Sequence, residues 1–377
     1  MLRRYEPLLR DCVSRDDVRF VIGEMISELN VGHAYVRGGY DRESTKRRNV
    51  GMLGADYQLK DGAFQITNIV EGGDWDFDSR GPLSQPNVDV NEGDYLLEVN
   101  GIPLDTSKSP HAAFLGLAGE VVTLTVSEKP TKDDDAREVV VKPLSSESRL
   151  RFREWVEHNR ARVEEMTNGQ VGYVYVPNTS TQGRTELFRQ FFGQRHKKAM
   201  IIDERWNGGG FIPNRIIELL NRPVMNYWAL RDGKDWTWPP DAHHGPKCML
   251  INGMAGSGGD CFPYYFRQLG IGPLIGMRTW GGLVGIQGYP RLMDGGGVTA
   301  PSFAFYEKDG TWGVEGHCVD PDVEIVDDPA QMVNGGDPQL DAAIKLMMTA
   351  IRREPFVPAK RPAYPDRTGM GIPETDW

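Results

Sequence analysis

Residues 199–210, AMIIDERWNGGG, contain the pattern that decides the fold. An uninterrupted apolar run that ends in an aspartate is typical of a buried strand. Three glycines close the stretch, and glycines let backbone N–H groups turn outward into a cleft, where they bind an anion or an oxyanion. The stretch therefore predicts an α/β domain with an anion cradle beside one of its strands.

The sequence on either side of this strand continues the alternation of strands and helices. Further strands are expected at 172–176 and 248–251, and helices at 152–166, 185–192, 216–220 and 258–269. Apolar strands between helices favour a layered α/β domain, which we place at 149–377. Residues 354–377 include five prolines and predict an extended tail.

A second glycine turn, AGSGGD at 255–260, lies between a predicted strand and a predicted helix. Ser257 would stand at the start of that helix, where the positive end of the helix dipole favours an alkoxide. Ala255 replaces the first glycine of a G-x-S-x-G elbow, and the turn is no nucleotide-binding P-loop. Taken alone, a glycine-rich turn with a capping serine is more often structural than catalytic.

The sequence before residue 149 divides into two further parts. Residues 1–40 predict a helical segment, with a capping box at Ser14 and Asp17 and an extended stretch from His33 onward. Residues 48–143 predict a β-module instead. Its strands are expected at 57–61, 63–70, 94–101, 121–128 and 137–143, with one helix near 110–116.

Composition excludes several classes of protein. The chain has 377 residues and a formal net charge of −10, which disfavours nucleic acid and anionic membranes as partners. No apolar run is long enough for a membrane-spanning helix, and the first twelve residues lack the apolar region of a secretory signal. We therefore expect neither a nucleic-acid-binding nor a membrane protein.

The four cysteines are scattered without a CxxC pair, which favours a reducing compartment and hence a cytoplasmic location. His243, His244 and Cys248 could hold a metal ion, but no second pair of ligands stands nearby. A surface loop is the preferred interpretation of these residues, and no cofactor is expected.

The β-module resembles a PDZ domain of the kind inserted in bacterial proteases, and EGDYLLEVNG at 92–101 carries the resemblance. The resemblance implies a groove in which the C-terminus of a peptide adds a strand beside a glycine-rich loop, here Gly51-Met52-Leu53-Gly54. The alternative is a structural β-module whose groove is never used.

Nearly the whole chain resembles the C-terminal half of the tricorn protease family, serine peptidases related to the carboxyl-terminal processing peptidases. The motifs are ELNVGHAYV at 28–36, the strand and glycine turn at 199–210, the segment 255–286, and VEGHCVDPDVEI at 314–325. The resemblance implies a PDZ domain with a β-barrel-like sheet, a crotonase-like α/β catalytic domain, peptide substrates and a homo-oligomer. The β-propeller domains of that family have no counterpart in this chain.

Carried over motif by motif, the resemblance implies Ser257 as nucleophile, His33 as general base and Glu315 as the acidic group that orients the histidine. The backbone N–H groups of Gly210 and Gly258 fall at the oxyanion-hole positions. An unactivated serine needs a base near neutral pH, and the base needs a third group to orient it, so the set is chemically consistent.

Two positions depart from the family pattern. A serine that precedes the catalytic histidine is replaced by Gly32, so Glu315 would act directly, through water or through another residue. The family's acidic contact for basic side chains has no clear match. Within the corresponding stretch, 226–232, Trp228 and Asp232 are the candidates for substrate binding.

Three other functions remain as alternatives. A Ser-Lys carboxyl-terminal processing peptidase would carry a lysine where this chain has Gly282. A non-catalytic PDZ scaffold would not need to retain Ser257, His33 and Glu315 together. An acyl-CoA enzyme with a related α/β core would leave the PDZ domain unexplained.

Overall fold

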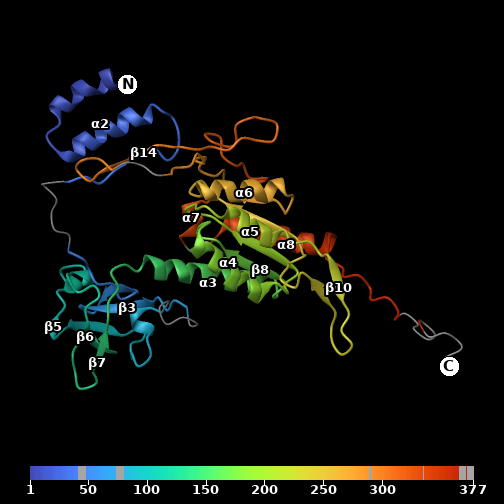
Figure 1. Cartoon of the computed structure of the whole chain (residues 1–377). Coiled ribbons are helices and arrows are strands. Elements are labelled where there is room, and N and C mark those ends of the chain that lie inside the picture. Colours follow the sequence, from blue (N-terminus) through green and yellow to red (C-terminus); the bar gives the residue numbers. More distant parts are fainter. Residues whose placement is uncertain (41–47, 74–79, 288–290, 334, 365–370, 372–377) are drawn as a thin grey trace. The chain divides into compact units, whose positions relative to one another are not determined.

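The computed structural model describes all residues except 41–47, 74–79, 288–290, 334, 365–370 and 372–377. The chain forms two compact units (Figure 1). Residues 1–40 and 163–377 make up the first unit, and residues 41–162 make up the second. The predicted mixed class, α/β together with β, is confirmed, whereas the crotonase-like detail and the exact domain limits stay predictions.

The first unit is built on a parallel sheet with the strand order β15-β13-β12-β9-β8. The strands are β8 (Val171–Tyr175), β9 (Ala199–Asp203), β12 (Lys247–Ile251), β13 (Leu274–Gly276) and β15 (Val323–Glu324). Every residue of β8, β9 and β12 is buried, which is why these strands read as continuous apolar runs. The three strands predicted from the sequence are therefore confirmed.

Helices cover both faces of this sheet. Side chains of α4 (Thr181–Gln194), α5 (Pro213–Leu220) and α6 (Gly258–Gln268) share one apolar core with alternate strand residues such as Met200 and Ile202. α5 and α6 lie side by side (Figure 1). Successive strand residues point to opposite faces, so this single core accounts for one face.

Helix α8 (Pro338–Arg353) packs on β9, β12 and β13. Its buried side chains do not belong to the apolar core shared by α4, α5 and α6, so we place α8 on the opposite face of the sheet. This helix was not predicted from the sequence. Its signals were Asp337, which caps the helix, Pro338 at the first helical position, and apolar residues at helical spacing. The short helix α7 (Pro329–Met332) precedes it.

A fully buried ion-pair network fixes the end of β9 to the start of α8. Arg205 is 0% exposed. Its guanidinium donates to both carboxylate oxygens of Asp203 and to both of Asp337, at 2.6–3.1 Å, and also reaches Gln339. Removing this charge from water is costly, and the hydrogen bonds offset the cost because each N–H group has an acceptor.

The N-terminal segment consists of helices joined to a short strand. Its elements are α1 (Leu2–Tyr5), the 3₁₀ helix η1 (Glu6–Asp11), α2 (Arg15–Ser27) and β1 (Tyr35–Arg37). The predicted capping box is present, since Ser14 Oγ accepts from the Asp17 N–H at 3.1 Å and Asp17 accepts from the Ser14 N–H at 2.8 Å. The box fixes the start of α2.

Strand β1 pairs antiparallel with β14 (Gly297–Thr299), which ties the N-terminal segment to a part of the chain that comes much later in sequence (Figure 1). β10 (Asn226–Trp228) and β11 (Trp236–Trp238) form a separate antiparallel hairpin. Both pairings depend on contacts that local sequence patterns do not encode, and neither was predicted.

The second unit contains an antiparallel six-stranded sheet with the order β2-β3-β4-β6-β7, to which β5 adds beside β4. The strands are β2 (Ala55–Lys60), β3 (Ala63–Ile69), β4 (Tyr95–Val99), β5 (Ile102–Pro103), β6 (Val122–Ser127) and β7 (Arg137–Val141). η3 (Pro82–Ser84) and η4 (Pro110–Phe114) are 3₁₀ helices, and the long helix α3 (Ser148–Met166) follows the sheet. The helix expected near 110–116 is thus a 3₁₀ helix.

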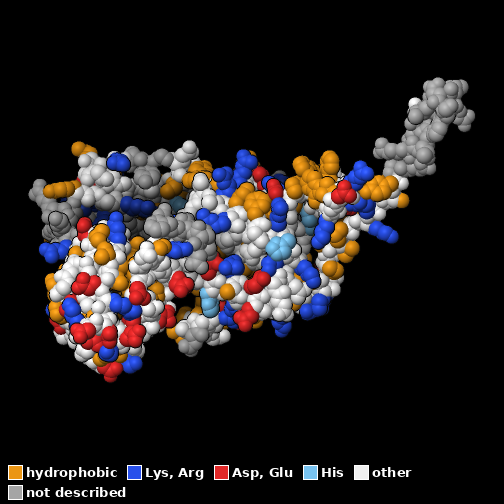
Figure 2. Space-filling model, turned by 90° about the horizontal axis from the view of Figure 1, so that it is seen from below, with side chains coloured by type: hydrophobic (Ala, Val, Ile, Leu, Met, Phe, Trp, Pro, Cys, Tyr) orange, Lys and Arg blue, Asp and Glu red, His pale blue; other side chains and the backbone are white. Residues whose placement is uncertain are grey.

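Two surface properties agree with the composition. Acidic and basic side chains occur together on the face shown in Figure 2, without one dominant basic patch there. Among the described residues, no helix has the length and apolar character needed to cross a membrane.

Candidate active site

Ser257 stands at the N-terminus of α6, as predicted, with backbone angles of φ 60° and ψ −115°. Residues with a Cβ atom seldom adopt a positive φ, so the turn is strained. The Ser257 N–H donates to Asp260 Oδ2 at 2.7 Å, which holds the turn in this conformation.

Backbone strain is concentrated around this turn. The described non-glycine residues with positive φ number nine, and five of them are Asn or Asp, which tolerate the left-handed region. The remaining four are His33, Trp206, Ser257 and Cys318. All four lie in the segments that were predicted to carry the site, and strained backbone of this kind is typical of active sites.

Gly210 and Gly258, the predicted oxyanion-hole residues, lie against each other. A methyl group on Gly258 would lie 2.7 Å from the Gly210 nitrogen. The neighbouring N–H groups of Gly208, Gly209, Gly256, Ser257 and Gly259 all have acceptors. Within the described chain, the N–H groups of Gly210 and Gly258 have none. Two backbone donors without acceptors in the described chain therefore lie beside Ser257, which is the arrangement that an oxyanion hole requires.

Asp260 connects the serine turn to the segment 279–284. It is buried, its Oδ2 accepts from Ser257, and its Oδ1 accepts from the Gly281 N–H at 2.7 Å. Burial raises the pKa of this carboxyl group. The sequence analysis gave Asp260 no role, although its spacing of three from Ser257 matches the capping box at Ser14 and Asp17.

His33 lies in a left-handed turn with φ 60° and not in a strand, because β1 begins only at Tyr35. The expectation that it lies on an extended stretch was wrong. Its ring packs edge-on against Trp280, with 5.5 Å between ring centroids. Burial lowers the pKa of His33, and the charges of Glu315 and Asp260 oppose this shift.

Glu315 binds the backbone on both sides of the site. Its Oε1 accepts from the Gly32 N–H at 2.7 Å, and its Oε2 accepts from the N–H groups of Leu283 at 2.5 Å and Val284 at 2.8 Å. Within the described part of the chain, Glu315 makes no hydrogen bond to His33, whose buried Nδ1 has no partner. Glu315 thus holds the residue before the histidine and not the imidazole itself.

The space around two glycines accounts for one departure from the family pattern, at Gly32, and bears on the Ser-Lys alternative, at Gly282. A Cβ atom on Gly32 would lie 2.7 Å from the Gly282 Cα, so no serine fits there. A Cβ atom on Gly282 would lie 2.1 Å from Trp280 Cζ3, so a lysine is excluded in this arrangement. The site has neither the fourth hydroxyl nor a lysine base because backbone and indole occupy those places.

Trp280 joins the histidine to the serine turn. The backbone N–H of Trp280 donates to the Ala255 carbonyl at 2.8 Å. Its indole ring lies so close to Gly256 that a methyl group on Gly256 would be 2.7 Å from Cε3. No hydrogen bond between His33 and Ser257 is present in the described residues. The indole ring nevertheless contacts His33 on one side and lies close to Gly256, the neighbour of Ser257, on the other. A cavity of about 550 Å³ adjoins this ring and is lined by Gly32, Trp280 and Glu315 among others.

Trp228 and Asp232, the candidates for substrate binding, lie on the hairpin formed by β10 and β11. Trp228 is 54% exposed and stacks on Trp236 at 5.8 Å between centroids, and Asp232 is exposed in the connecting loop. No contact recorded for the described residues joins either side chain to the serine turn. Their role in substrate binding stays a prediction.

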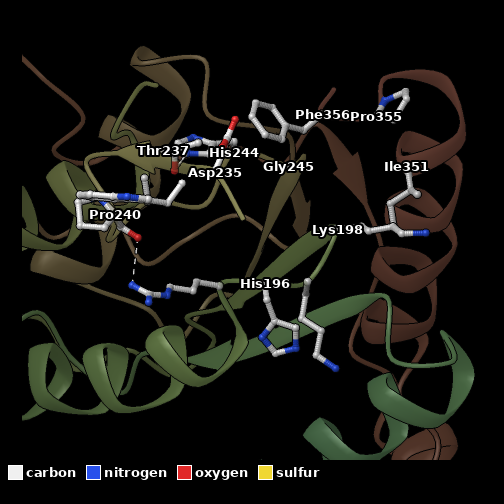
Figure 3. A pocket seen from close by; sticks show the side chains of 14 residues that line it. His196, Lys198, Asp235, Thr237, Pro240, His244, Gly245, Ile351, Pro355 and Phe356 are labelled. Carbon is white, nitrogen blue, oxygen red and sulfur yellow. Dashed lines mark hydrogen bonds between the residues drawn. The ribbon is translucent and has the colours of Figure 1, made fainter. Parts of the chain in front are cut away.

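A larger cavity, of about 660 Å³, lies elsewhere in the first unit (Figure 3). Figure 3 shows His196 and Lys198 on one side of it and His244 and Phe356 on the other. None of the predicted catalytic residues lines it, so its size does not identify it as the catalytic site.

The residues considered as metal ligands do not converge. His243 is only 2% exposed, so the predicted surface loop was wrong for this residue, and its Nε2 contacts the Lys197 carbonyl at 3.0 Å. His244 contacts Thr237 instead, and Cys248 is buried in β12. The described ranges contain no group of three side chains placed to bind a metal ion.

In the second unit, the glycine-rich loop of the PDZ-like module is already occupied by the chain itself. The Gly51 N–H donates to the Phe114 carbonyl at 2.9 Å, and the Met52 N–H donates to the Leu144 carbonyl at 2.8 Å. The Gly54 N–H donates to Glu147 Oε2 at 3.1 Å. A carboxylate of this chain therefore lies at the loop that was expected to bind a peptide's C-terminus.

Comparison with known proteins agrees with both parts of this architecture. Residues 51–146 match the tricorn protease PDZ domain, and residues 170–325 match peptidase family S41. A crystal structure of the tricorn protease superposes with a TM-score of 0.86 at 32% identity, over 93% of this chain and 34% of that one. The match confirms the PDZ domain and the α/β peptidase domain predicted from the sequence.

Curated relatives give the same result. Tricorn protease homolog 1 of Streptomyces coelicolor is 37% identical over 96% of this chain and 33% of its own length. The tricorn protease of Thermoplasma volcanium is 34% identical over 93% of this chain and 34% of its own length. This chain therefore spans about a third of these relatives. The chain therefore combines a PDZ domain of the tricorn protease type with a domain of peptidase family S41, the two domains that the comparisons identify in it.

Proposed function

We propose that this chain hydrolyses peptides as a serine endopeptidase, through an acyl-enzyme on Ser257. One observation carries the proposal. Ser257 stands in a strained turn beside the N–H groups of Gly210 and Gly258, which have no acceptor in the described chain. A nucleophile at a helix N-terminus next to two unpaired donors is suited to acyl transfer.

In the proposed reaction, His33 accepts the proton of Ser257 Oγ as this oxygen attacks the carbonyl carbon of the scissile peptide bond. The negative charge moves to the carbonyl oxygen, where Gly210 and Gly258 donate to it. His33 then gives its proton to the leaving amine, and the C–N bond breaks. Water attacks the resulting ester with His33 again as base, which releases the acid and regenerates Ser257.

In this mechanism Glu315 is a positioning residue. Its carboxylate accepts from the Gly32 N–H, and Gly32 immediately precedes His33. Its negative charge also favours the protonated imidazole that forms during the reaction. Catalysis needs the imidazole to approach Ser257 more closely than in this structure, which is common for proteases without bound substrate.

The test is cleavage of a mixed peptide library by the wild type, Ser257→Ala and Ser107→Ala. Ser107 is a matched control in the second unit, because its exposed hydroxyl contacts only Asp105. We expect the wild type and Ser107→Ala to cleave and Ser257→Ala to lose nearly all activity. Cleavage that survives in Ser257→Ala, or a wild type that cleaves nothing, would contradict the proposal and favour a scaffold or another enzyme class.

We also propose that peptides with a free C-terminus bind the PDZ domain. In addition, we propose that the protein is located in the cytoplasm and that it forms a homo-oligomer. The four cysteines lie within the described residues and are unpaired, which is compatible with a reducing compartment. Light scattering of the purified chain tests the oligomer, since a monomer at all concentrations would contradict it.

A further inference from the structure

Thr179 contains a buried hydroxyl group that the proposed mechanism does not use. The residue is 0% exposed, and its Oγ1 has no hydrogen-bond partner among the described residues. A buried hydroxyl without a partner is costly, because it has given up its hydrogen bonds to water. Such a group in a folded protein calls for a functional explanation.

The backbone around Thr179 is fixed on both sides. Its N–H donates to the Gly209 carbonyl at 2.9 Å, and its own carbonyl accepts from the Ile212 N–H at 2.9 Å. Thr179 therefore pairs with the glycine turn at 208–210. On its C-terminal side, Asn178 Oδ1 accepts from the N–H groups of Ser180 and Gly183, which secures the start of α4. These contacts fix the backbone from which the buried Thr179 side chain projects.

The hydroxyl oxygen lies close to the backbone of Gly258 and Gly210. A methyl group on Gly258 would lie 2.0 Å from Thr179 Oγ1 and 2.7 Å from the Gly210 nitrogen. A methyl group on Gly210 would lie 2.5 Å from the Thr179 carbonyl carbon. Three donors without acceptors among the described residues, the two glycine N–H groups and this hydroxyl, thus belong to residues that lie close together.

We propose that the Thr179 hydroxyl is a third donor of the oxyanion hole. The proposal rests on the proposed function and names a further catalytic residue for it. As negative charge develops on the substrate carbonyl oxygen, the Oγ1–H group donates to that oxygen together with Gly210 and Gly258. The donor is preorganised, since burial and the two backbone hydrogen bonds leave it little freedom.

The experiment compares Thr179→Val, Thr179→Ser and Thr185→Val with the wild type. Valine keeps the shape of threonine without the hydroxyl, serine keeps the hydroxyl, and Thr185 is an exposed control whose hydroxyl bonds the Thr181 carbonyl. We measure kcat and KM on the best peptide from the library, and Ki for the aldehyde of that peptide. The aldehyde forms a tetrahedral adduct with an oxyanion, whereas the cleaved peptide product does not.

We expect Thr179→Val to lower kcat by about 10- to 100-fold, at or below the lower end of the roughly 100- to 1,000-fold effect of losing an oxyanion donor, with KM little changed. The Ki of the aldehyde should rise in parallel, while the Ki of the product peptide stays the same. Thr179→Ser and Thr185→Val should remain near the wild type.

Wild-type kcat and aldehyde Ki in a folded Thr179→Val variant would overturn the inference. If thermal unfolding shows that this variant does not fold, Thr179→Ala takes its place and the same two constants decide. If the Ki of the product peptide rises as much as the Ki of the aldehyde, the role of Thr179 is structural, and this result would also overturn the inference. Activity that does not depend on Ser257 would instead overturn the proposed function, so the two failures are distinct.

Discussion

At the scale of single residues, the site depends on an imidazole, that of His33, whose pKa is lowered so that it is neutral over a wider pH range. Burial lowers the pKa of His33 below its ordinary value of 6.5 and outweighs the charges of Glu315 and Asp260. A general base works in its neutral form, so activity is lost as the pH falls through the lowered pKa.

We therefore predict that the acidic limb of kcat/KM lies below about pH 6.5, the unperturbed histidine value. The measurement is kcat/KM on one library peptide between about pH 4.5 and 8, at constant ionic strength. A limb at or above the unperturbed value would show that the carboxylates outweigh burial. A profile without an acidic limb would argue against His33 as the base.

Gly32 illustrates how one missing side chain follows from its surroundings. Gly32→Ser would restore the hydroxyl of the family pattern, but its Cβ atom would lie 2.7 Å from the Gly282 Cα. We predict a loss of about 1–3 kcal/mol in stability, typical of overpacking, and a large fall in kcat/KM because His33 moves with its neighbour.

Thermal unfolding and kcat/KM check this prediction, with Gly193→Ser in α4 as the control. A methyl group on the exposed Gly193 meets no atom within 4 Å, so this variant should stay close to the wild type. A Gly32→Ser variant that is more active than the wild type would show that the site lacks its fourth hydroxyl for no steric reason.

At the scale of elements, the PDZ loop shows a contact that competes with a ligand. Glu147 accepts from the Gly54 N–H and is held there by Arg151, whose Nε donates to it at 2.7 Å. A peptide's terminal carboxylate that used the same N–H group would have to displace this side chain.

We predict that Glu147→Ala binds a peptide with a free C-terminus about tenfold more tightly than the wild type, which corresponds to about 1.4 kcal/mol. Fluorescence anisotropy with the peptide and its C-terminal amide measures this, and Glu120→Ala serves as an exposed control. If neither the wild type nor Glu147→Ala binds the peptide with a free C-terminus, the PDZ domain has a structural role and its glycine-rich loop binds no ligand.

The elements also show what local patterns can predict. The buried strands β8, β9 and β12 and the helix α6 were evident because apolar runs and capping residues act over a few positions. The pairing of β1 with β14 was not evident, because a strand of three residues is too short for its sequence to indicate which strand it pairs with. The same limit explains the incorrect placement of His33 on a strand.

At the scale of the whole molecule, stability depends on contacts between distant segments. Arg205 at the end of β9 is paired with Asp337 at the start of α8, and both are buried. Removal of one partner from a buried pair leaves an uncompensated charge.

We predict that Asp337→Ala lowers the free energy of unfolding by about 3–5 kcal/mol. Urea unfolding followed by far-UV circular dichroism measures the change. Lys345→Ala, an exposed change on the same helix, should stay within about 0.5 kcal/mol of the wild type. A similar small effect for Asp337→Ala would mean that Asp203 and Gln339 alone satisfy the guanidinium.

The sequence by itself predicted an α/β part and a β part of the chain, and a serine, Ser257, in a glycine turn at the start of a helix, because turns, caps and buried strands are encoded by neighbouring residues. The resemblance to a known family, and not local pattern, implied the PDZ domain and the roles of Gly210, Gly258, His33 and Glu315, and it did not show how these residues are placed. Only the tertiary structure revealed that Glu315 binds the backbone before His33, that Asp260 ties the serine turn to residue 281, and that Thr179 faces Gly258. These contacts join segments that lie far apart in the chain, and burial and packing in the folded protein decide them.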